Sequence, residues 1–382
     1  MMKKPLGIYV HIPFCIQKCH YCDFCSAAAN EDTKERYASA LIKNIRMVCG
    51  NFVDYEVDSV FFGGGTPTCL PTKTLSDILF SIKRNFSVSK NAEISLECNP
   101  ATANYDNFKA LVDSGFNRLS MGVQSVHDKE LKALGRIHSF ADFEKTFLDA
   151  RRAGFDNINL DLMYGIPLQT ESSFKKTLDV ISSYSPEHIS AYSLKIEPGT
   201  LFFKNKDKLL LPDEDSEYNM YQSALSILKR NGYKHYEISN YSKDGYHSRH
   251  NLKYWNADDY IGFGVSAHSC INRHRYAIIN DTSLYSNIIL NELEDAYYFE
   301  TEALSDAEFA EEYIMMCLRL SDGLSTIEYE KIFSSSLPQK YLDRMIPYIK
   351  SGHIICNDNR YSLSDTGMYV SNYILSDILD LE

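Results

Sequence analysis

The stretch Cys15-Ile16-Gln17-Lys18-Cys19-His20-Tyr21-Cys22 places three cysteines at C-x3-C-x2-C spacing. It follows a short apolar run, residues 8–14, of the kind that forms a buried strand. A further cysteine, Cys25, lies close behind, so four of the ten cysteines in the chain fall in one loop. Such clustering in a 382-residue chain indicates a metal site rather than a disulfide framework.

The three spaced cysteines suit an iron–sulfur cluster better than a zinc ion. Structural zinc usually takes four ligands from two paired motifs, and the second pair is missing here. A zinc site would have to be completed by Cys25, His11 or His20. A [4Fe–4S] cluster with three cysteine ligands leaves one iron open, which suits a cluster that binds a substrate or cofactor directly. The spacing therefore predicts a [4Fe–4S] cluster, with zinc as the alternative.

The first 232 residues alternate between short apolar runs and amphipathic helical patterns. Six strand–helix units in series imply a parallel sheet with right-handed crossovers, covered on both faces. Six units are fewer than the eight of a closed barrel, so we expect an α/β fold built on a partial, open barrel. The expected strands are 8–14, 57–62, 93–98, 118–123, 157–163 and 188–196, and the expected helices are 33–49, 73–86, 105–115, 140–154, 172–184 and 217–232.

Beyond residue 232 the pattern changes, and two further segments are expected. Residues 233–300 are rich in Tyr, His, Asn and Asp and predict a connecting region of short strands and loops, with part of 281–298 helical. Residues 301–382 predict a small helical, winged-helix-like domain. Its helices are expected at 306–320, 325–332, 339–350 and 366–379, with a two-stranded hairpin at 353–363.

The composition argues against several classes of protein. With 51 acidic and 39 basic residues the formal charge is −12, which disfavours a nucleic-acid binder that needs a basic face. No stretch of about 18 uncharged apolar residues occurs, so we expect no transmembrane segment. Peripheral association with a membrane stays open. The N-terminal residues lack the apolar core and cleavage site of a signal peptide, so we expect a cytoplasmic protein.

A glycine-rich turn and four polar residues mark a second functional region. Gly63-Gly64-Gly65-Thr66-Pro67 follows the second expected strand, where glycines expose backbone groups to a ligand. Alone, such a turn is a weak signal, because tight turns account for most of them. Barrel folds carry their chemistry at the carboxyl ends of strands. Four polar residues fall at or near such ends, and they favour one site with the cysteine loop: Glu97, Gln124, Arg136 and Asp161.

The cysteine spacing, with Tyr21 immediately before the third cysteine, resembles the radical S-adenosylmethionine superfamily. The resemblance implies that Cys15, Cys19 and Cys22 hold a [4Fe–4S] cluster whose open iron binds S-adenosyl-L-methionine. One electron from the cluster then cleaves the sulfonium bond and yields a 5′-deoxyadenosyl radical. The superfamily fold is a partial six-unit α/β barrel, which agrees with the strand count made independently above.

From residue 7 to about residue 200 the motifs are similar to the family that contains oxygen-independent coproporphyrinogen III oxidase and the HemW-type heme chaperones. Carried over position by position, the resemblance implies two adjacent ligand sites. The first S-adenosylmethionine is expected at Tyr9, Gly64 and Glu97, with Gly65 and Thr66 beside it. The second site is expected to include Tyr21, Gln124, Arg136 and Asp161, and Phe24 is expected near an adenine.

Three features in which this chain differs from the oxidases of that family favour the chaperones. The oxidases place a cysteine two positions after the third cysteine, where this chain has Phe24, and Cys25 comes one position late. Only 14 residues precede Cys15, too few for the N-terminal extension of the oxidases. The string 250–255, His-Asn-Leu-Lys-Tyr-Trp, matches the H-N-x-x-Y-W motif of the chaperones.

The resemblance therefore implies a protein that binds heme and delivers it to heme-requiring respiratory proteins. His250 is the expected axial ligand, with Tyr254 and Trp255 covering a porphyrin face. His247 and His268 are rival ligands, and a packed loop histidine is the structural alternative. An electron donor such as flavodoxin or ferredoxin is expected. The alternative function is oxidative decarboxylation of coproporphyrinogen III to protoporphyrinogen IX, which is not expected here.

Overall fold

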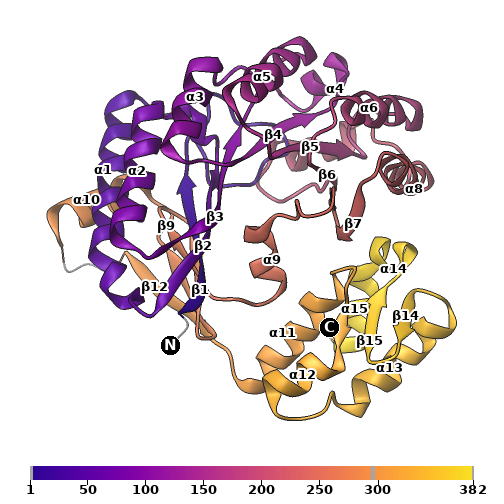
Figure 1. The fold of residues 1–382 in the computed structure, drawn as a ribbon. Helices are drawn as coiled ribbons and strands as arrows, with labels where there is room; N and C mark the ends of the chain where they lie inside the picture. The colour runs from indigo at the N-terminus through magenta and orange to yellow at the C-terminus, as the bar shows by residue number, and fades with distance from the viewer. Residues whose placement is uncertain (1–2, 294–296, 381–382) are drawn as a thin grey trace.

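Six strand–helix units form the open barrel that the sequence predicts (Figure 1). The structure is a computed structural model and describes residues 3–293 and 297–380. The barrel strands pair in parallel in chain order: β1 (Lys4–Ile12), β2 (Tyr55–Gly64), β3 (Val88–Cys98), β4 (Arg118–Gln124), β5 (Ile158–Tyr164) and β6 (His188–Ser193). Their crossover helices are α1 (Glu31–Val48), α2 (Thr72–Asn85), α3 (Tyr105–Ser114), α5 (Phe140–Ala153), α6 (Glu171–Ser183) and α8 (Glu214–Arg230).

Two short helices interrupt the regular alternation. Helix α4 (Asp128–Ala133) precedes α5, and α7 (Leu201–Lys204) precedes α8. The crossover helices begin and end at residues that physical chemistry favours. Asn104 and Ser139 cap the N-termini of α3 and α5 through capping boxes. Gly115 and Gly154 end the same helices with φ of 102° and 108°, a left-handed conformation that glycine adopts without a steric penalty.

The two faces of the barrel strands differ in chemistry, and this difference positions the site. In β4 the residues Leu119, Met121 and Val123 are fully buried in the main hydrophobic core under the helices. Because side chains alternate along a strand, the intervening residues Arg118 and Ser120 face the barrel interior. The interior is polar rather than filled by the apolar layers of a closed barrel, which leaves room for ligands.

The segment 233–300 does not form a separate connecting region, because its strands extend both edges of the barrel sheet. Strands β7 (Lys234–Glu237) and β8 (Asn240–Ser242) continue the sheet from β6. Strand β9 (Tyr260–Phe263) pairs in parallel with β1 at the opposite edge. Three antiparallel strands follow outward from β9: β10 (His268–Ile271), β11 (His274–Ile278) and β12 (Tyr298–Ala303). The open barrel thus becomes one 12-stranded sheet in which no barrel strand is an edge.

Two helices also lie in this segment. Helix α10 (Thr282–Asn291) packs on α1, and it is the helical part expected within 281–298. Residues 294–296 of that range lie outside the described residues. Helix α9 (Arg249–Trp255) carries the His-Asn-Leu-Lys-Tyr-Trp motif, for which a loop was expected. Ser248 caps its N-terminus, and Glu93 of β3 accepts hydrogen bonds from the backbone of residues 249 and 250. A helix this short depends on such fixed ends.

The C-terminal domain has the expected winged-helix-like architecture and its own hydrophobic core. Its three helices and hairpin are α11 (Asp306–Leu318), α12 (Thr326–Phe333), α13 (Gln339–Lys350), β14 (Ile354–Asn357) and β15 (Arg360–Leu363). A two-residue strand that the sequence did not reveal, β13 (Leu324–Ser325), pairs with β15. The expected last helix is divided into α14 (Asp365–Tyr369) and α15 (Ser371–Leu379).

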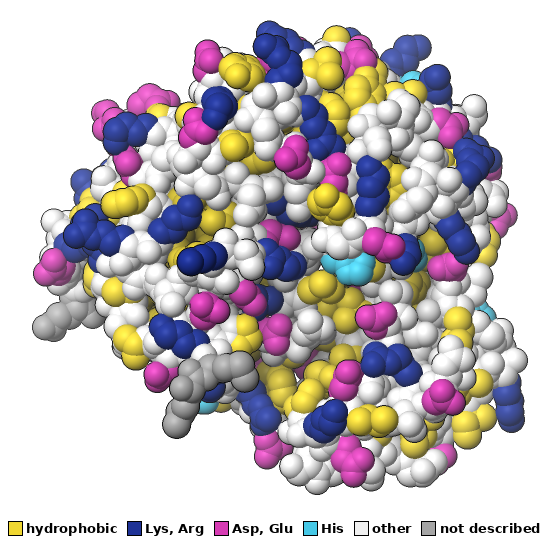
Figure 2. Space-filling model, in the orientation of Figure 1, with side chains coloured by type: hydrophobic (Ala, Val, Ile, Leu, Met, Phe, Trp, Pro, Cys, Tyr) yellow, Lys and Arg dark blue, Asp and Glu magenta, His cyan; other side chains and the backbone are white. Residues whose placement is uncertain are grey.

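Basic and acidic side chains are interspersed on the face shown in Figure 2. Among the described helices, none combines the length and the apolar character needed to cross a bilayer.

Candidate functional site

The cysteine loop follows β1 and is anchored at both ends by backbone hydrogen bonds. The amide of Cys15 donates to the carbonyl of Ala27 at 3.1 Å, and the amide of Ala27 donates to the carbonyl of Pro13 at 3.0 Å. In the middle of the loop, the amide of His20 donates to the carbonyl of Leu134 at 3.0 Å. The loop is therefore held at the mouth of the barrel before any metal binds.

The three spaced cysteines line the central cavity and are free thiols. Among the described residues, no three His, Cys, Asp or Glu side chains are grouped so that they could hold one metal ion. Three thiols are the donor set that a [4Fe–4S] cluster takes, one on each of three irons, whereas a structural zinc ion usually needs a fourth ligand.

The residues that could complete a zinc site are engaged elsewhere. The thiol of Cys25 donates to Oδ1 of Asn280 at 2.7 Å. His11 uses Nε2 for the carbonyl of Cys25 and Nδ1 for the hydroxyl of Tyr9. His20 uses Nδ1 for the carbonyl of Ala133. Of the four cysteines in the loop, Cys15, Cys19 and Cys22 line the cavity and Cys25 does not.

The glycine turn at the end of β2 packs directly against the segment that leads into the cysteine loop. A Cβ atom on Gly64, which has φ of +113°, would lie 2.5 Å from the His11 ring, and one on Gly65 would lie 2.6 Å from the carbonyl oxygen of Phe14. Both contacts are too short for any side chain. The amides of Gly65 and Thr66 donate to the carbonyls of Ile12 and Phe14. Glycine is therefore required here for the turn to approach the loop.

Glu97 joins the glycine turn to the barrel interior. Its Oε2 accepts a hydrogen bond from the amide of Gly64 at 3.1 Å. Burial, and secondarily the nearby Asp161 carboxyl, raise the pKa of Glu97 to about 8. Tyr9 of β1 also lines this part of the cavity, and burial raises its pKa well above the usual value. The residues expected around the first S-adenosylmethionine, including Gly64, Gly65 and Thr66, therefore all line the same cavity.

Two of the residues expected at the second site, Tyr21 and Arg136, belong to a chain of hydrogen bonds. Arg136 donates from Nη2 to the hydroxyl of Tyr21 at 2.7 Å and from Nη1 to Oδ1 of Asn99 at 2.6 Å. Asn99 in turn donates to Oγ1 of Thr66 at 2.8 Å. Gln124 ends β4 with φ of +67°, a conformation uncommon for a residue with a side chain and often found at functional sites. Asn99 also lines the cavity, and the sequence did not single it out.

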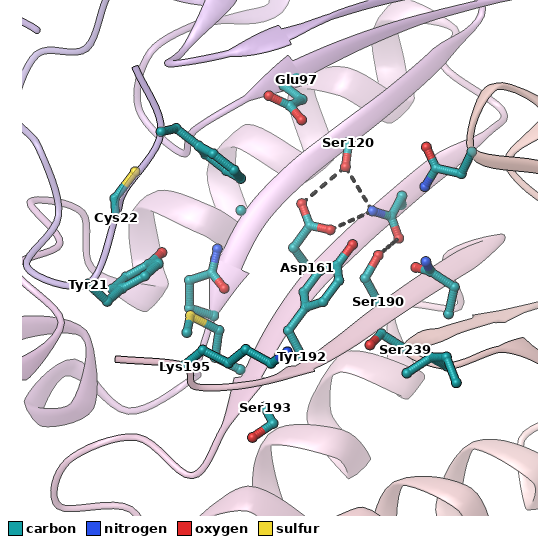
Figure 3. Close-up of a pocket in the computed structure, with 18 of the residues that line it drawn as sticks. Tyr21, Cys22, Glu97, Ser120, Asp161, Ser190, Tyr192, Ser193, Lys195 and Ser239 are labelled. Carbon is teal, nitrogen blue, oxygen red and sulfur yellow. Dashed lines mark hydrogen bonds between the residues drawn. The ribbon is translucent and has the colours of Figure 1, made fainter. Parts of the chain in front are cut away.

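Asp161 lies at the centre of a network from three neighbouring strands (Figure 3). It accepts hydrogen bonds from Ser120 at 3.0 Å and from Nδ2 of Asn159 at 2.7 Å. Burial raises the pKa of Asp161 despite these bonds. Ser190 of β6 donates to Oδ1 of Asn159 at 3.2 Å. Asp161 was expected at or near a strand end but lies in the middle of β5. Serines and asparagines are too common in strands for sequence alone to single out the other members of the network.

The cavity has a volume of about 1540 Å³ and extends from the cysteine loop to the C-terminal domain. That volume exceeds the range of about 300–1,000 Å³ that is usual for one small ligand. The near end is lined by the residues described above. The far end is lined by residues of α9, α11, α14 and α15, among them Tyr254, Trp255, Met316, Met368 and Tyr369. The C-terminal domain therefore helps to wall the ligand space of the barrel.

His250 lies in the cavity wall but has no free ring nitrogen. Its side chain is only 1% exposed, with Nδ1 3.0 Å from the hydroxyl of Ser59 and Nε2 2.9 Å from the hydroxyl of Tyr254. Burial lowers the pKa of His250 to about 3, so the ring is neutral. Iron ligation by His250 would require Tyr254 to leave Nε2. The rival histidines His247 and His268 do not line the cavity.

Phe24 lines the cavity from the cysteine loop and is 63% exposed. Its neighbour Ile16 is 61% exposed and also lies in the loop. A large exposed aromatic beside a cavity is available to stack on a ligand, since nothing in the protein covers it. The expected role of Phe24 near an adenine stays a prediction.

Replacing Glu97 with glutamine should weaken S-adenosylmethionine binding about 10-fold or more, because glutamine cannot ionise to meet the positively charged ligand as the glutamate would on binding, while cluster content stays near normal. It should also change stability. Folding raises the pKa of Glu97 from its usual 4.5 to about 8, so this group destabilises the fold progressively as pH rises between those values. Thermal unfolding of reconstituted, ligand-free protein should show a steeper loss from about pH 6 to about pH 8 in wild type than in Glu97→Gln.

The matched control is Glu144→Gln, on a carboxyl that bonds Tyr184 and does not line the cavity. It should bind S-adenosylmethionine like wild type. Equal affinity in Glu97→Gln and wild type, measured with intact cluster, would remove Glu97 from the ligand site.

Comparisons with known proteins agree with this geometry. Residues 9–181 match the radical SAM superfamily model, and residues 304–370 match the HemN C-terminal domain model. The heme chaperone HemW of Buchnera aphidicola subsp. Acyrthosiphon pisum is 34% identical over 373 residues, which cover 97% of each chain. The heme chaperone HemW of Bacillus subtilis is 33% identical over 374 residues, covering 97% of this chain and 98% of the relative.

The fold has a solved counterpart in coproporphyrinogen III oxidase (HemN) from Escherichia coli. The TM-score is 0.86 at 24% identity, and the match covers 99% of this chain and 91% of the other. At that identity the match shows the shared fold of barrel and C-terminal domain. The full-length identity to the chaperones is higher and shows the family: the chain belongs to the HemW heme chaperones within the radical SAM superfamily.

Proposed function

We propose that this protein is a radical SAM heme chaperone, which binds heme and a [4Fe–4S] cluster and delivers heme to respiratory heme proteins. The observation that carries the proposal is the single cavity of about 1540 Å³ with two chemically different ends. One end has the thiols and polar strand ends of a cluster and cofactor site. The other has the aromatic and methionine side chains that suit a large flat apolar ligand.

At the near end, different residues would hold the cluster, the S-adenosylmethionine and the second ligand. Cys15, Cys19 and Cys22 would supply the three thiolates, and the turn at Gly64 and Gly65 would offer backbone groups to S-adenosylmethionine. When bound, the reduced cluster would supply the electron for reductive cleavage of S-adenosylmethionine. The proposed heme binding does not depend on whether the chaperone function uses that cleavage. Arg136, fixed between Tyr21 and Asn99, would orient the second ligand.

At the far end, Tyr254 and Trp255 of α9 would face the porphyrin. The guanidinium carbon of Arg319 lies 5.9 Å from the centre of the Trp255 ring, which links this helix to the C-terminal domain. His250 is the candidate axial ligand, since it is the one of the three proposed histidines that lines the cavity. Heme binding would have to separate its Nε2 from the Tyr254 hydroxyl.

The partners in this proposal are heme, a respiratory heme-acceptor protein and an electron donor such as flavodoxin or ferredoxin. The exposed side chains of Ile16 and Phe24 beside the cysteines support a donor contact at the loop, because they leave apolar surface near the expected cluster. A cytoplasmic location, with peripheral contact at a membrane where acceptors reside, completes the proposal.

Heme titration of the anaerobically reconstituted protein, run beside a coproporphyrinogen oxidase assay, tests the function. We expect saturable heme binding with about one heme per chain and no protoporphyrinogen, even with reductant and S-adenosylmethionine present. Conversion of coproporphyrinogen III would instead assign the oxidase activity. A protein that binds no heme under these conditions is not a heme chaperone.

A further inference from the structure

Arg118 is a charged side chain buried inside the barrel. It is the first residue of β4 and is only 2% exposed. Ser120, Gly122 and Gln124, which follow on the same face of the strand, all line the central cavity, and so does Arg118. The guanidinium is therefore shielded from bulk solvent but lies in the ligand space.

No group in the part of the chain that the structure describes pairs with this guanidinium. Among the described residues Arg118 takes part in no side-chain hydrogen bond and has no carboxylate oxygen within 4.0 Å, and its Nε is buried without a partner. By contrast Arg136, in the same cavity, donates to both Asn99 and Tyr21. Burying a charge without a partner is costly, so a buried arginine is normally paired.

The two cavity carboxyls that feel the charge of Arg118 do not neutralise it by contact. Arg118 acts on Glu97 and Asp161 to lower their pKa values, yet burial dominates and raises both. Each carboxyl already has other partners, the amide of Gly64 for Glu97 and the side chains of Ser120 and Asn159 for Asp161. With Glu97 at a pKa of about 8, its carboxyl is largely protonated at neutral pH.

The surroundings leave room for a ligand group. The residue paired with Arg118 on β3 is Ser95, and the next inward residue on β4 is Ser120, both with small side chains. On the other neighbouring strand, β5, Asn159 pairs with Ser120 and is followed by Asp161, which Figure 3 shows near Ser120. A planar carboxylate could approach the guanidinium without displacing a large side chain.

We infer that Arg118 is the anchor of a carboxylate-binding site inside the barrel, and that it receives a propionate of the bound heme. The inference rests on the proposed heme-binding function. An arginine presents paired N–H groups that match both oxygens of a carboxylate. Heme is apolar on its faces and carries two propionates on one edge, so an edge-on contact here would fix its orientation in a cavity whose far end is aromatic.

A second source of a carboxylate is S-adenosylmethionine itself. Its carboxylate is expected on the open iron beside the cysteine loop, whereas Arg118 lies at the start of β4, away from the strand ends that meet the loop. Binding measurements with the two ligands separate these sources.

The test uses full-length, reconstituted protein with two probes: iron protoporphyrin IX and its dimethyl ester, in which both propionates are neutral. Wild type should bind the free acid about 10-fold or more tightly than the ester, the range expected for a charge-assisted contact. Arg118→Gln should bind the two porphyrins equally, and Arg118→Lys should keep part of the preference. Arg230→Gln, on an exposed arginine outside the cavity, is the matched control and should behave as wild type.

Each of the remaining results overturns the inference, reassigns the site or overturns the proposed function. Equal affinity of wild type for iron protoporphyrin IX and for its dimethyl ester would overturn the inference. This comparison uses wild type alone, so it tests the inference even if Arg118→Gln fails to fold. A preference that survives in Arg118→Gln would also overturn it. A large loss of S-adenosylmethionine affinity in Arg118→Gln, with the porphyrin preference intact, would assign the site to S-adenosylmethionine. Failure of wild type to bind either porphyrin would overturn the proposed function itself.

Discussion

Cys19→Ser is expected to leave the reconstituted protein without most of its [4Fe–4S] cluster, and Cys15→Ser and Cys22→Ser should have the same effect. Each of the three cysteines lines the cavity, and each would bind a different iron. A serine hydroxyl is a harder and weaker ligand for iron than a thiolate, so each substitution removes one of the three protein ligands of the cluster. Iron and sulfide content, with the visible absorption of the cluster, measures the loss.

Cys25→Ser is the matched control, because Cys25 lies in the same loop and differs in what it contacts. Its thiol donates to Asn280, and its carbonyl accepts from His11, so neither group depends on a metal. Cluster content should stay near that of wild type. A loss as large as that in Cys19→Ser would show that Cys25 is a cluster ligand. Cys25 would then occupy the iron that S-adenosylmethionine is expected to bind.

The barrel could be predicted from the sequence because its signals are local. The apolar run of β4 and the glycines that end α3 and α5 each act within a few residues, and six such units define a parallel sheet. The C-terminal hairpin and helices follow from the same kind of signal. The type and order of these elements follow because propensity, capping and hydrophobic pattern agree, although the first strand begins and ends earlier than expected and the last helix is divided.

The segment after residue 232 was harder to predict, because its structure depends on distant partners. Strand β9 has only four residues and pairs with β1, which lies at the other end of the chain. Helix α9 is held at its start by Glu93 of β3, a contact that no local pattern reveals. Elements this short take their conformation from tertiary contacts rather than from their own sequence.

Some residues of the site could likewise be predicted from the sequence, whereas others depend on tertiary contacts. Cysteine spacing and the glycine turn identified one end of the cavity, because the residue types themselves are diagnostic. Arg118 gave no such signal: it stands at the start of a strand, where an arginine is ordinarily exposed. Only the structure shows it buried and unpaired. Likewise, the hydrogen bonds that occupy both nitrogens of His250 depend on Ser59 and Tyr254 and change what its ligation requires.

His250→Ala is expected to lower heme affinity at least about 10-fold and to shift the Soret band, because loss of even an outer ligand partner commonly costs that much metal affinity. The ring is neutral, as an iron ligand must be, and the histidine lines the cavity beside two aromatic side chains. Cluster content should hardly change. The substitution also opens a cavity and leaves the hydroxyls of Ser59 and Tyr254 without this partner, so unfolding must be measured in parallel.

Tyr254→Phe separates ligation from a purely structural role. It removes the same hydrogen bond to Nε2 with almost no change in volume, and it leaves His250 free to bind iron. If His250 is the ligand, the Soret band of Tyr254→Phe should match wild type and heme should bind at least as tightly, because the competing hydroxyl is gone. If the histidine only supports α9, both substitutions should lower stability while the Soret band of His250→Ala stays that of wild type. That second pattern would exclude iron ligation by His250 and leave the cavity aromatics to hold heme without it.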